Sequence, residues 1–230
     1  MRYARYLMLL LCSLLLPAFA HAACVDNVVM VHGNTGSPSD FQATHDELIH
    51  RGYTEAQLFA PAWGNGLCAA CNDHSASELM PVEQAIGDAV ASSCTGKIDV
   101  IGHSMGATLA AKAIVDLNAS SSVDAFVGIA GAFHGLYACG YYPFNVATVT
   151  CGSKGLSIQS PLLTSLATKH FGAREYSIKS YSDEINCYYS CLVYGVHTSS
   201  ITGETASYTY TYAHYGLLWY TASKQADLIQ

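Results

Sequence analysis

Charged residues, and basic ones above all, are scarce in this chain. Only 12% of its 230 residues are charged, and the 10 Lys and Arg are outnumbered by 17 Asp and Glu. A formal charge of −7 leaves no basic patch that could neutralise phosphates, which excludes nucleic acid as a partner. Disorder is excluded as well, because 51% of the residues are hydrophobic. The length suits one globular domain with a large core.

Long hydrophobic runs are absent beyond the first 20 positions, which excludes a polytopic membrane protein. The start of the chain is typical of a secretion signal: Arg2 and Arg5 precede the apolar stretch Tyr6–Leu16, Pro17 ends it, and alanines two positions apart lead to Ala22. We predict a signal peptide over residues 1–22, a single domain over 23–230 and no stable membrane anchor. We also predict export to the periplasm or the extracellular space. An uncleaved membrane anchor is the alternative interpretation.

Cysteines are numerous, and their count agrees with export. One of the nine, Cys12, lies in the predicted signal, and the even number that remains predicts up to four disulfides: Cys24, Cys68, Cys71, Cys94, Cys139, Cys151, Cys187 and Cys191. A lipid on Cys24 is one alternative, although it would leave an odd number. A redox pair or zinc site at Cys68-x-x-Cys71, with His74 nearby, is another. An oxidising compartment favours disulfides, so we predict no metal and no cofactor.

Strand and helix patterns alternate along the chain. Short runs of β-branched residues predict strands, and apolar residues at helical spacing predict helices. The predicted strands cover residues 28–31, 58–60, 98–101, 125–130, 176–181 and 207–212, and the predicted helices cover 37–52, a segment that starts at Pro81, 105–117 and 215–228. This alternation predicts an α/β fold with a mostly parallel sheet of about six strands and helices on both faces.

Residues 102–106 read Gly-His-Ser-Met-Gly and match the pattern G-x-S-x-G. They lie directly between a predicted strand and a predicted helix. A serine at such a turn projects its hydroxyl above the sheet, next to the free N–H groups of the helix N-terminus. We predict that Ser104 is a nucleophile. The main-chain N–H groups of Met105 and of Asn34, in the loop after the first strand, are predicted to form an oxyanion hole. An ordinary Gly-Ser turn is the alternative.

An acid and then a histidine should follow the nucleophile in the chain. Asp183 is the acid that lies immediately past the end of a predicted strand, where loops that face a substrate begin. His214 lies between the last predicted strand and the last predicted helix, at the same edge of the sheet. We predict that His214 takes the proton of Ser104, while Asp183 orients the His214 ring and stabilises its cation. His197 is the second candidate for the base, and His134 and His170 are further ones.

Three segments resemble the small bacterial class 2 lipases of the α/β-hydrolase superfamily. They are residues 28–33 (Val-Val-Met-Val-His-Gly), 98–106 (Ile-Asp-Val-Ile-Gly-His-Ser-Met-Gly) and 214–218 (His-Tyr-Gly-Leu-Leu). Residues 180–185 are similar to the acid-bearing loop of that family, which supports Asp183. The resemblance implies a compact α/β-hydrolase fold and a secreted bacterial lipase or carboxylesterase that needs no cofactor.

A second resemblance leaves the substrate open. Residues 130–139 (Ala-Gly-Ala-Phe-His-Gly-Leu-Tyr-Ala-Cys) and 150–153 (Thr-Cys-Gly-Ser) are similar to an extracellular poly(3-hydroxybutyrate) depolymerase related to those lipases. A polyester is therefore an alternative substrate. The additional cysteines and the loop 63–80 depart from the smallest lipases. An amidase or peptidase stays possible because a triad does not distinguish esters from amides, and a non-catalytic secreted binding module is the alternative from another class.

An open cleft is expected at the nucleophile. Only 79 positions separate Ser104 from Asp183, and they must also supply a strand, so a large helical lid does not fit. We expect Phe133, Leu136 and Tyr137 to line the cleft and to contact acyl chains or polyester segments. The ester or polyester substrate is the expected partner, and we expect a monomer.

The implied fold also predicts how the cysteines pair. Cys24 and Cys94 lie just before the strands that begin at Val28 and Ile98, and this fold places those strands side by side and parallel. We therefore predict a disulfide between them at the amino edge of the sheet. Proximity in the sequence suggests Cys68–Cys71, Cys139–Cys151 and Cys187–Cys191 for the other pairs.

Overall fold

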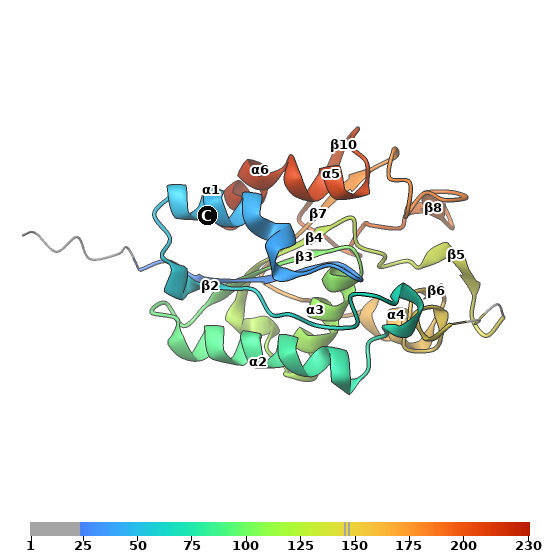
Figure 1. The fold of residues 1–230 in the computed structure, drawn as a ribbon, viewed down its shortest axis with the longest axis horizontal. Coiled ribbons are helices and arrows are strands. Elements are labelled where there is room, and N and C mark those ends of the chain that lie inside the picture. Colours follow the sequence, from blue (N-terminus) through green and yellow to red (C-terminus); the bar gives the residue numbers. More distant parts are fainter. Residues whose placement is uncertain (1–23, 145, 147) are drawn as a thin grey trace, which may run out of the picture.

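A six-stranded parallel sheet forms the centre of the protein (Figure 1). This computed structural model describes residues 24–144, 146 and 148–230, so the predicted signal peptide lies outside the described residues. Every pair of neighbouring strands in the sheet is parallel, which confirms the sequence prediction. The strands run in the order β10 (Ala206–Tyr210), β7 (Arg174–Ser180), β4 (Val123–Ile129), β3 (Ile98–His103), β1 (Asn27–Val31) and β2 (Leu58–Phe59).

Helices cover both faces of this sheet (Figure 1). One face packs against α2 (Ala76–Ser92) and α3 (Met105–Asp116), and the other against α1 (Gln42–His50), α5 (His214–Trp219) and α6 (Ala222–Leu228). Alternate residues of β1 supply the two cores: Val29 and Val31 join one apolar cluster, and Val28 and Met30 join the other. Side chains of a strand point alternately to opposite faces, so a strand that is covered on both faces is apolar throughout.

Two helix boundaries differ from the sequence prediction. The helix expected to start at Pro81 begins at Ala76, directly after Ser75, whose hydroxyl donates to Glu78 Oε2 at 2.9 Å. Pro81 lies inside α2, one turn after the exposed Ser77. A proline there removes only one N–H bond from the ladder near a solvated helix start, so the rest of the helix can form.

The closing helix, expected to run unbroken from residue 215, is split into α5 and α6. Side chains replace main-chain hydrogen bonds at the break. The Thr221 hydroxyl donates to Leu217 O at 2.6 Å, and the buried Gln225 amide donates to Leu218 O at 2.8 Å.

Short elements that the sequence did not predict surround the carboxyl edge of the sheet. β5 (Leu136–Tyr141) pairs with β6 (Ser157–Ile158) in parallel, and β8 (Leu192–Val193) pairs with β9 (Val196–His197) as an antiparallel hairpin. α4 (Pro161–Leu166) follows β6. Single 3-10 turns complete the described chain: η1 (Pro38–Phe41), η2 (Glu55–Gln57), η3 (Ala69–Cys71), η4 (Ser120–Ser122) and η5 (Val149–Cys151). None of the described helices is both long and apolar enough to cross a membrane.

The structure joins the eight described cysteines in the four pairs expected from the sequence: Cys24–Cys94, Cys68–Cys71, Cys139–Cys151 and Cys187–Cys191. The Cα atoms of Cys24 and Cys94 are 5.8 Å apart, just before the starts of β1 and β3. The other three disulfides each close a short loop.

Candidate active site

Ser104 occupies a strained turn between β3 and α3. Its φ of 55° lies in the left-handed region, which a residue other than glycine rarely adopts. The glycines on either side allow the turn to close tightly: a Cβ on Gly102 would come within 2.5 Å of Ala107 Cα, and a Cβ on Gly106 would overlap the carbonyl oxygen of His32. Ser104 N donates to Ile129 O at 2.8 Å and ties the turn to the end of β4. The serine is therefore held on a sharp strand-to-helix turn.

Asp183 and His214 form a buried pair. Nδ1 of His214 lies 2.8 Å from each carboxylate oxygen of Asp183, and each residue is only 1% exposed. The Oδ1 atom of Asp183 also accepts from the main-chain N–H groups of Ile185 and Asn186, at 3.0 and 2.9 Å. With its proton on Nδ1 held by the carboxylate, the imidazole keeps Nε2 free as a base.

The main chain of His214 is held by two residues that sequence reasoning missed. Its N–H donates to Glu184 Oε2 at 2.9 Å, and its carbonyl lies 3.3 Å from His103 Nε2. Burial, and next the neighbouring His214, lower the pKa of His103 well below its ordinary value, so this ring is neutral near pH 7 and donates through Nε2. Glu184 directly follows the predicted acid, and His103 lies inside the G-x-S-x-G segment, but nothing in either position shows that it contacts His214.

One cavity of about 220 Å³ brings the predicted residues together. Ser104, His214 and both predicted oxyanion residues, Met105 and Asn34, line it. Its remaining lining is mostly apolar or small: Gly33, Thr35, Ala69, Leu136, Thr150, Leu156, Ile185 and Tyr215. The predicted nucleophile, the predicted base and the candidate oxyanion donors thus share one space at the carboxyl edge of the sheet.

Of the three residues expected to contact substrate, only Leu136 lines this cavity. Phe133 instead packs in the core, with its ring centroid 6.2 Å from that of Phe126 and 6.0 Å from that of Phe171. Tyr137 follows Leu136 on β5 and packs edge-on against Tyr141, 6.1 Å between centroids. Because neighbouring residues of a strand face opposite ways, Leu136 and Tyr137 cannot both face the cavity.

The loop that precedes Asn34 is braced by His32 and Trp63. The Trp63 indole donates to His32 O at 2.9 Å, the Trp63 N–H donates to His32 Nε2 at 3.3 Å, and the two rings stack 5.2 Å apart. His32 is 1% exposed and burial lowers its pKa, so it is a neutral structural residue. Gly36 N donates to Gly33 O at 3.0 Å and closes the turn that contains Asn34.

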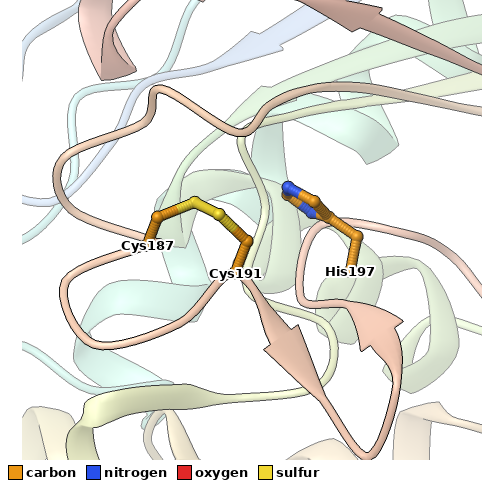
Figure 2. Close-up of side chains that lie close together, drawn as sticks. All are labelled: Cys187, Cys191 and His197. Carbon is orange, nitrogen blue, oxygen red and sulfur yellow. A yellow bond between two sulfur atoms is a disulfide. The ribbon is translucent and has the colours of Figure 1, made fainter.

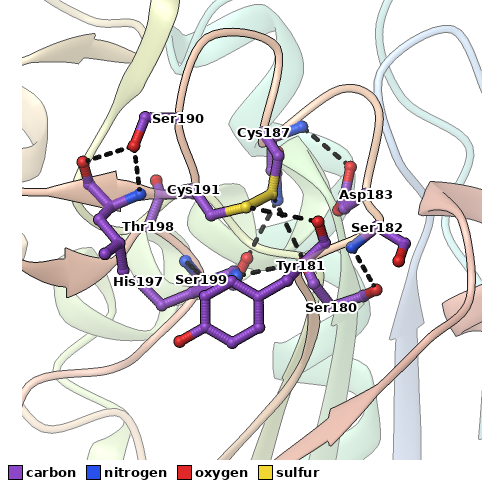
Figure 3. Close-up of a disulfide and its surroundings, with 12 residues drawn as sticks. Ser180, Tyr181, Ser182, Asp183, Cys187, Ser190, Cys191, His197, Thr198 and Ser199 are labelled. Atoms are coloured by element: carbon purple, nitrogen blue, oxygen red, sulfur yellow. Dashed lines mark hydrogen bonds between the residues drawn. A yellow bond between two sulfur atoms is a disulfide. The ribbon is translucent and has the colours of Figure 1, made fainter.

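A disulfide closes the segment after Asp183. Figure 3 shows Cys187–Cys191 beside this acid, with Cys187 N donating to Asp183 O at 2.9 Å. Figure 2 shows His197, the second candidate for the base, beside this disulfide. Both of its ring nitrogens are occupied: Nε2 is 3.2 Å from Ser180 O, and Nδ1 accepts from Ser199 N at 3.1 Å. This arrangement favours His214 over His197.

Two groups of side chains have the composition of metal ligands. Ligand atoms of Cys187, Cys191 and His197 lie within 4.8 Å of one another, but metal binding needs thiolates and these sulfurs are bonded to each other (Figure 2). Carboxylate oxygens of Asp26, Asp99 and Asp124 are equally close, at the amino edge of the sheet. That edge is opposite Ser104, so neither group supplies a metal to the cavity.

A larger cavity of about 470 Å³ lies between α2, α3 and α4. Its histidine, His74, is fully engaged: Nδ1 is 2.9 Å from Lys154 O and Nε2 is 2.8 Å from the Thr108 hydroxyl. Burial lowers the pKa of His74 to about 4. No serine–histidine–acid arrangement occurs among the described residues around this cavity, so its size does not make it the catalytic site.

Comparison with known proteins matches the chain to a family and to solved folds. The family model described as Lipase (class 2) matches residues 26–226. No curated protein matches the chain in sequence. The fold is similar to that of mature Bacillus licheniformis lipase BlEst2, with a TM-score of 0.66 and 13% identity over 90% of this chain and 93% of that one.

Two other solved structures share the fold. Aspergillus fumigatus lipase B has a TM-score of 0.59 and 19% identity over 88% of this chain and 51% of its own, so the chain spans about half the length of that lipase. A hyperthermophilic esterase from the archaeon Pyrobaculum calidifontis has a TM-score of 0.58 and 16% identity, over 89% of this chain and 76% of that one.

Proposed function

Because the chain belongs to the class 2 lipase family and is a carboxylic ester hydrolase, we propose that Ser104, His214 and Asp183 are its catalytic triad. The observation that carries this proposal is the buried Asp183–His214 pair, joined at 2.8 Å, at a cavity that Ser104 also lines. Met105 and Asn34, which line the same cavity, are the proposed oxyanion donors.

The proposed reaction has two halves, the acylation of Ser104 and its deacylation, and each of these groups acts in both. Ser104 Oγ attacks the ester carbonyl carbon as His214 Nε2 accepts its proton, and Asp183 stabilises the imidazolium that forms. The carbonyl oxygen becomes an oxyanion and accepts from the N–H groups of Met105 and Asn34, at the positive end of α3. His214 then protonates the leaving alcohol, which leaves an acyl ester on Ser104. In the second half, water attacks the acyl carbon as His214 Nε2 takes its proton; the bond from that carbon to Ser104 Oγ breaks, the acid leaves, and His214 returns the proton to Oγ.

The volume of the cavity limits the length of the acyl group that fits inside it. At about 220 Å³ it is smaller than the roughly 300–1,000 Å³ typical of sites for drug-sized ligands, and Leu136, Leu156 and Ile185 give it apolar walls. A short acyl group fits inside, whereas a long chain must extend beyond it. We therefore propose a preference for esters of short-chain acids.

A polyester is the second candidate substrate, and one surface feature favours it. Tyr181, Tyr188 and Tyr189 are 60, 65 and 74% exposed, on the same loop as Ile185, which lines the cavity. A polymer chain that continues beyond the cavity could lie against these rings, as apolar binding surfaces often use aromatic side chains.

The four disulfides fit a compartment outside the cytoplasm. We propose that the protein is exported from a bacterium by a signal peptide over residues 1–22 and acts as a monomeric single domain over 23–230, and that its partner is the ester substrate.

Labelling by an organophosphonate tests the proposed nucleophile. An activated serine forms a covalent adduct, so mass spectrometry should find the label on the peptide that contains Ser104, and Ser104→Ala should lose both the label and ester hydrolysis while keeping the wild-type circular dichroism spectrum. Label on another residue would contradict the assignment.

A hydrolysis panel then separates the substrate classes. It contains p-nitrophenyl esters of increasing chain length, tributyrin, polyhydroxybutyrate and an amide control. A maximum at short soluble esters supports the esterase proposal, and faster release from the polymer supports the second candidate.

A further inference from the structure

The side chain of Asn34 reaches across to a segment more than thirty positions later in the chain. Its Oδ1 accepts from Asn72 Nδ2 at 2.6 Å, and its Nδ2 donates to Ala69 O at 2.9 Å. Both ends of the Asn34 amide are thus held by the loop that contains the Cys68–Cys71 disulfide. The main-chain N–H of Asn34 is the proposed oxyanion donor. The side chain that is anchored and the N–H that would donate therefore belong to the same residue.

Asn72 is itself held rigidly. It is 1% exposed, its Oδ1 accepts from Asn65 N at 2.7 Å, and its Nδ2 is also 3.1 Å from Asn65 O. Gly64, with φ of 69°, lets the chain pass close by, because a Cβ there would lie 3.1 Å from Asn72 Oδ1. The Asn72 amide therefore has no freedom to rotate away from Asn34.

A second disulfide loop braces the first. The Thr150 hydroxyl lies 2.6 Å from Ala69 O and 2.5 Å from Asn72 O. Thr150 directly precedes Cys151, whose disulfide to Cys139 closes the segment after β5. Ala69 and Thr150 also line the cavity of Ser104. The first disulfide-closed loop thus holds the Asn34 side chain directly, and the second supports it through Ala69 and Asn72.

The turn that contains Asn34 needs such a brace. One main-chain hydrogen bond closes it, from Gly36 N to Gly33 O, and Thr35 within it has a φ of 58°. Gly33 has no Cβ, so the peptide between Gly33 and Asn34 can rotate about Gly33 at small cost. An oxyanion donor contributes only if it is aimed before the charge forms.

We propose that Asn72 is a positioning residue for the oxyanion hole, which acts by holding the Asn34 amide so that the Asn34 N–H points into the cavity above Ser104. This inference rests on the proposed role of Asn34. Because the oxyanion exists only in the transition state, loss of the brace lowers kcat and leaves KM nearly unchanged.

Two substitutions remove the brace in different ways. Asn72→Ala deletes the amide, whereas Asn72→Asp keeps an acceptor for Asn65 N and places an oxygen opposite Asn34 Oδ1. Complete loss of one oxyanion donor costs about 10²–10³-fold in kcat, so a donor that is only misaimed should cost about 10–100-fold. Asn65→Ala is the matched control: Asn65 is in the same loop, but its side chain accepts from Leu67 N at 2.9 Å.

The measurements are kcat and KM on a soluble short-chain p-nitrophenyl ester, and the affinity for an alkyl boronic acid, which forms a tetrahedral adduct with an activated serine. For both Asn72 variants, kcat and the affinity for the boronic acid should fall by similar factors, and KM should stay within about twofold of the wild-type value. Asn65→Ala should match the wild type in all three quantities. Thermal unfolding of each variant identifies any that does not fold.

Asn34→Ala and the Asn34→Ala/Asn72→Ala double variant show whether Asn72 acts through Asn34. Asn34→Ala keeps the main-chain N–H but loses the anchor, so it should lose as much kcat as Asn72→Ala, and the double variant should lose no more. This variant also keeps the test decisive if Asn72→Ala does not fold.

The inference is overturned if Asn34→Ala and Asn72→Asp keep wild-type kcat. It is also overturned if the losses in kcat of the single variants multiply in the double variant, or if the substitutions change KM instead of kcat. Ser104→Ala separates these results from a failure of the proposed triad. If Ser104→Ala is inactive while Asn34→Ala and Asn72→Asp are fully active, the positioning role fails and the triad stands.

Discussion

Gly106 and His32 are in direct contact through their main chains. A Cβ on Gly106 would overlap the His32 carbonyl oxygen and would lie 2.5 Å from Val31 O. The first turn of α3, which follows Ser104, is therefore packed against the end of β1, which leads into the loop of Asn34. The contact joins the segment after Ser104 to the segment before Asn34 through main-chain atoms.

Gly106→Ala should therefore disrupt both stability and catalysis. The added methyl group forces α3 away from β1, an overpacking change that typically costs about 1–3 kcal/mol, and it separates the two proposed oxyanion donors. Gly87→Ala is the control, since Gly87 lies in α2 with open space around its Cα and alanine favours a helix by up to about 1 kcal/mol. Urea unfolding and ester hydrolysis measure both effects. Wild-type kcat in Gly106→Ala would contradict the role of this contact.

Substitution of the partners of Ser104 should distinguish His214 from His197. His214→Ala and Asp183→Asn should each lower kcat by about 10³-fold or more, because one removes the base and the other leaves its ring in the wrong tautomer. His197→Ala should keep most of the activity, since both nitrogens of that ring bond to the protein frame. An inactive His197→Ala beside an active His214→Ala would show that the base is misassigned.

The three residues of the proposed triad can be predicted from the sequence because of one topological rule. Each of Ser104, Asp183 and His214 directly follows a strand or the turn after it, and parallel strands in this sheet end at one edge. Local patterns are sufficient for that step, since they identify strands and the carboxyl edge follows from their direction.

Features that depend on distant contacts are not readable in this way. The break before α6 depends on Gln225, which bonds to Leu218 O and accepts from Thr44, 181 positions away. The core position of Phe133 depends on Phe126 and Phe171 meeting it there. A single sequence contains no signal for such pairs, so it does not show that Phe133 lies away from the cavity of Ser104.

The buried carboxyl group of Asp99 should make stability depend on pH. Asp99 is fully buried, and among the described residues its Oδ2 has no hydrogen-bond partner; burial, and next Asp26, raise its pKa to about 8. The folded protein thus binds a proton that the unfolded chain releases near pH 4, so stability should fall as pH rises from about 4 to about 8, by up to about 1.4 kcal/mol per pH unit.

Asp99→Asn removes this titration and keeps an acceptor for Ala125 N, which donates to Asp99 Oδ1 at 3.0 Å. Its stability relative to the wild type should increase with pH up to about 8 and then stay constant. Urea unfolding at several pH values measures the difference, with the exposed Asp88→Asn as the control. If the free energy of unfolding changes with pH in the same way for Asp99→Asn and the wild type, Asp99 is ionised in the folded protein.

Removal of the Cys24–Cys94 disulfide should destabilise the protein without reducing activity. This disulfide spans 70 positions and should contribute about 4 kcal/mol through the entropy of the unfolded chain, against about 3 for Cys139–Cys151, which spans 12. Cys24→Ser/Cys94→Ser should therefore unfold at lower urea concentration than Cys139→Ser/Cys151→Ser. Its kcat should stay at the wild-type level, because the disulfide lies at the edge opposite Ser104. Peptide mapping without reduction that joins Cys24 to a different cysteine would contradict the pairing.

Activation at an oil–water interface should be absent. Lipases with large helical lids respond to an interface because opening the lid exposes an apolar cleft. Here the longest helix of the described chain between β4 and β7 is the six-residue α4, and none of its residues lines the cavity of Ser104. The loops that do line it contain Ala69 and Thr150, which the Cys68–Cys71 and Cys139–Cys151 disulfides restrain. A cavity with restrained walls receives dissolved and aggregated esters through the same opening, so the rate of tributyrin hydrolysis should saturate smoothly through the solubility limit of the substrate. An abrupt rise at that limit, in a plot of rate against tributyrin concentration, would show that one of these loops moves as a lid.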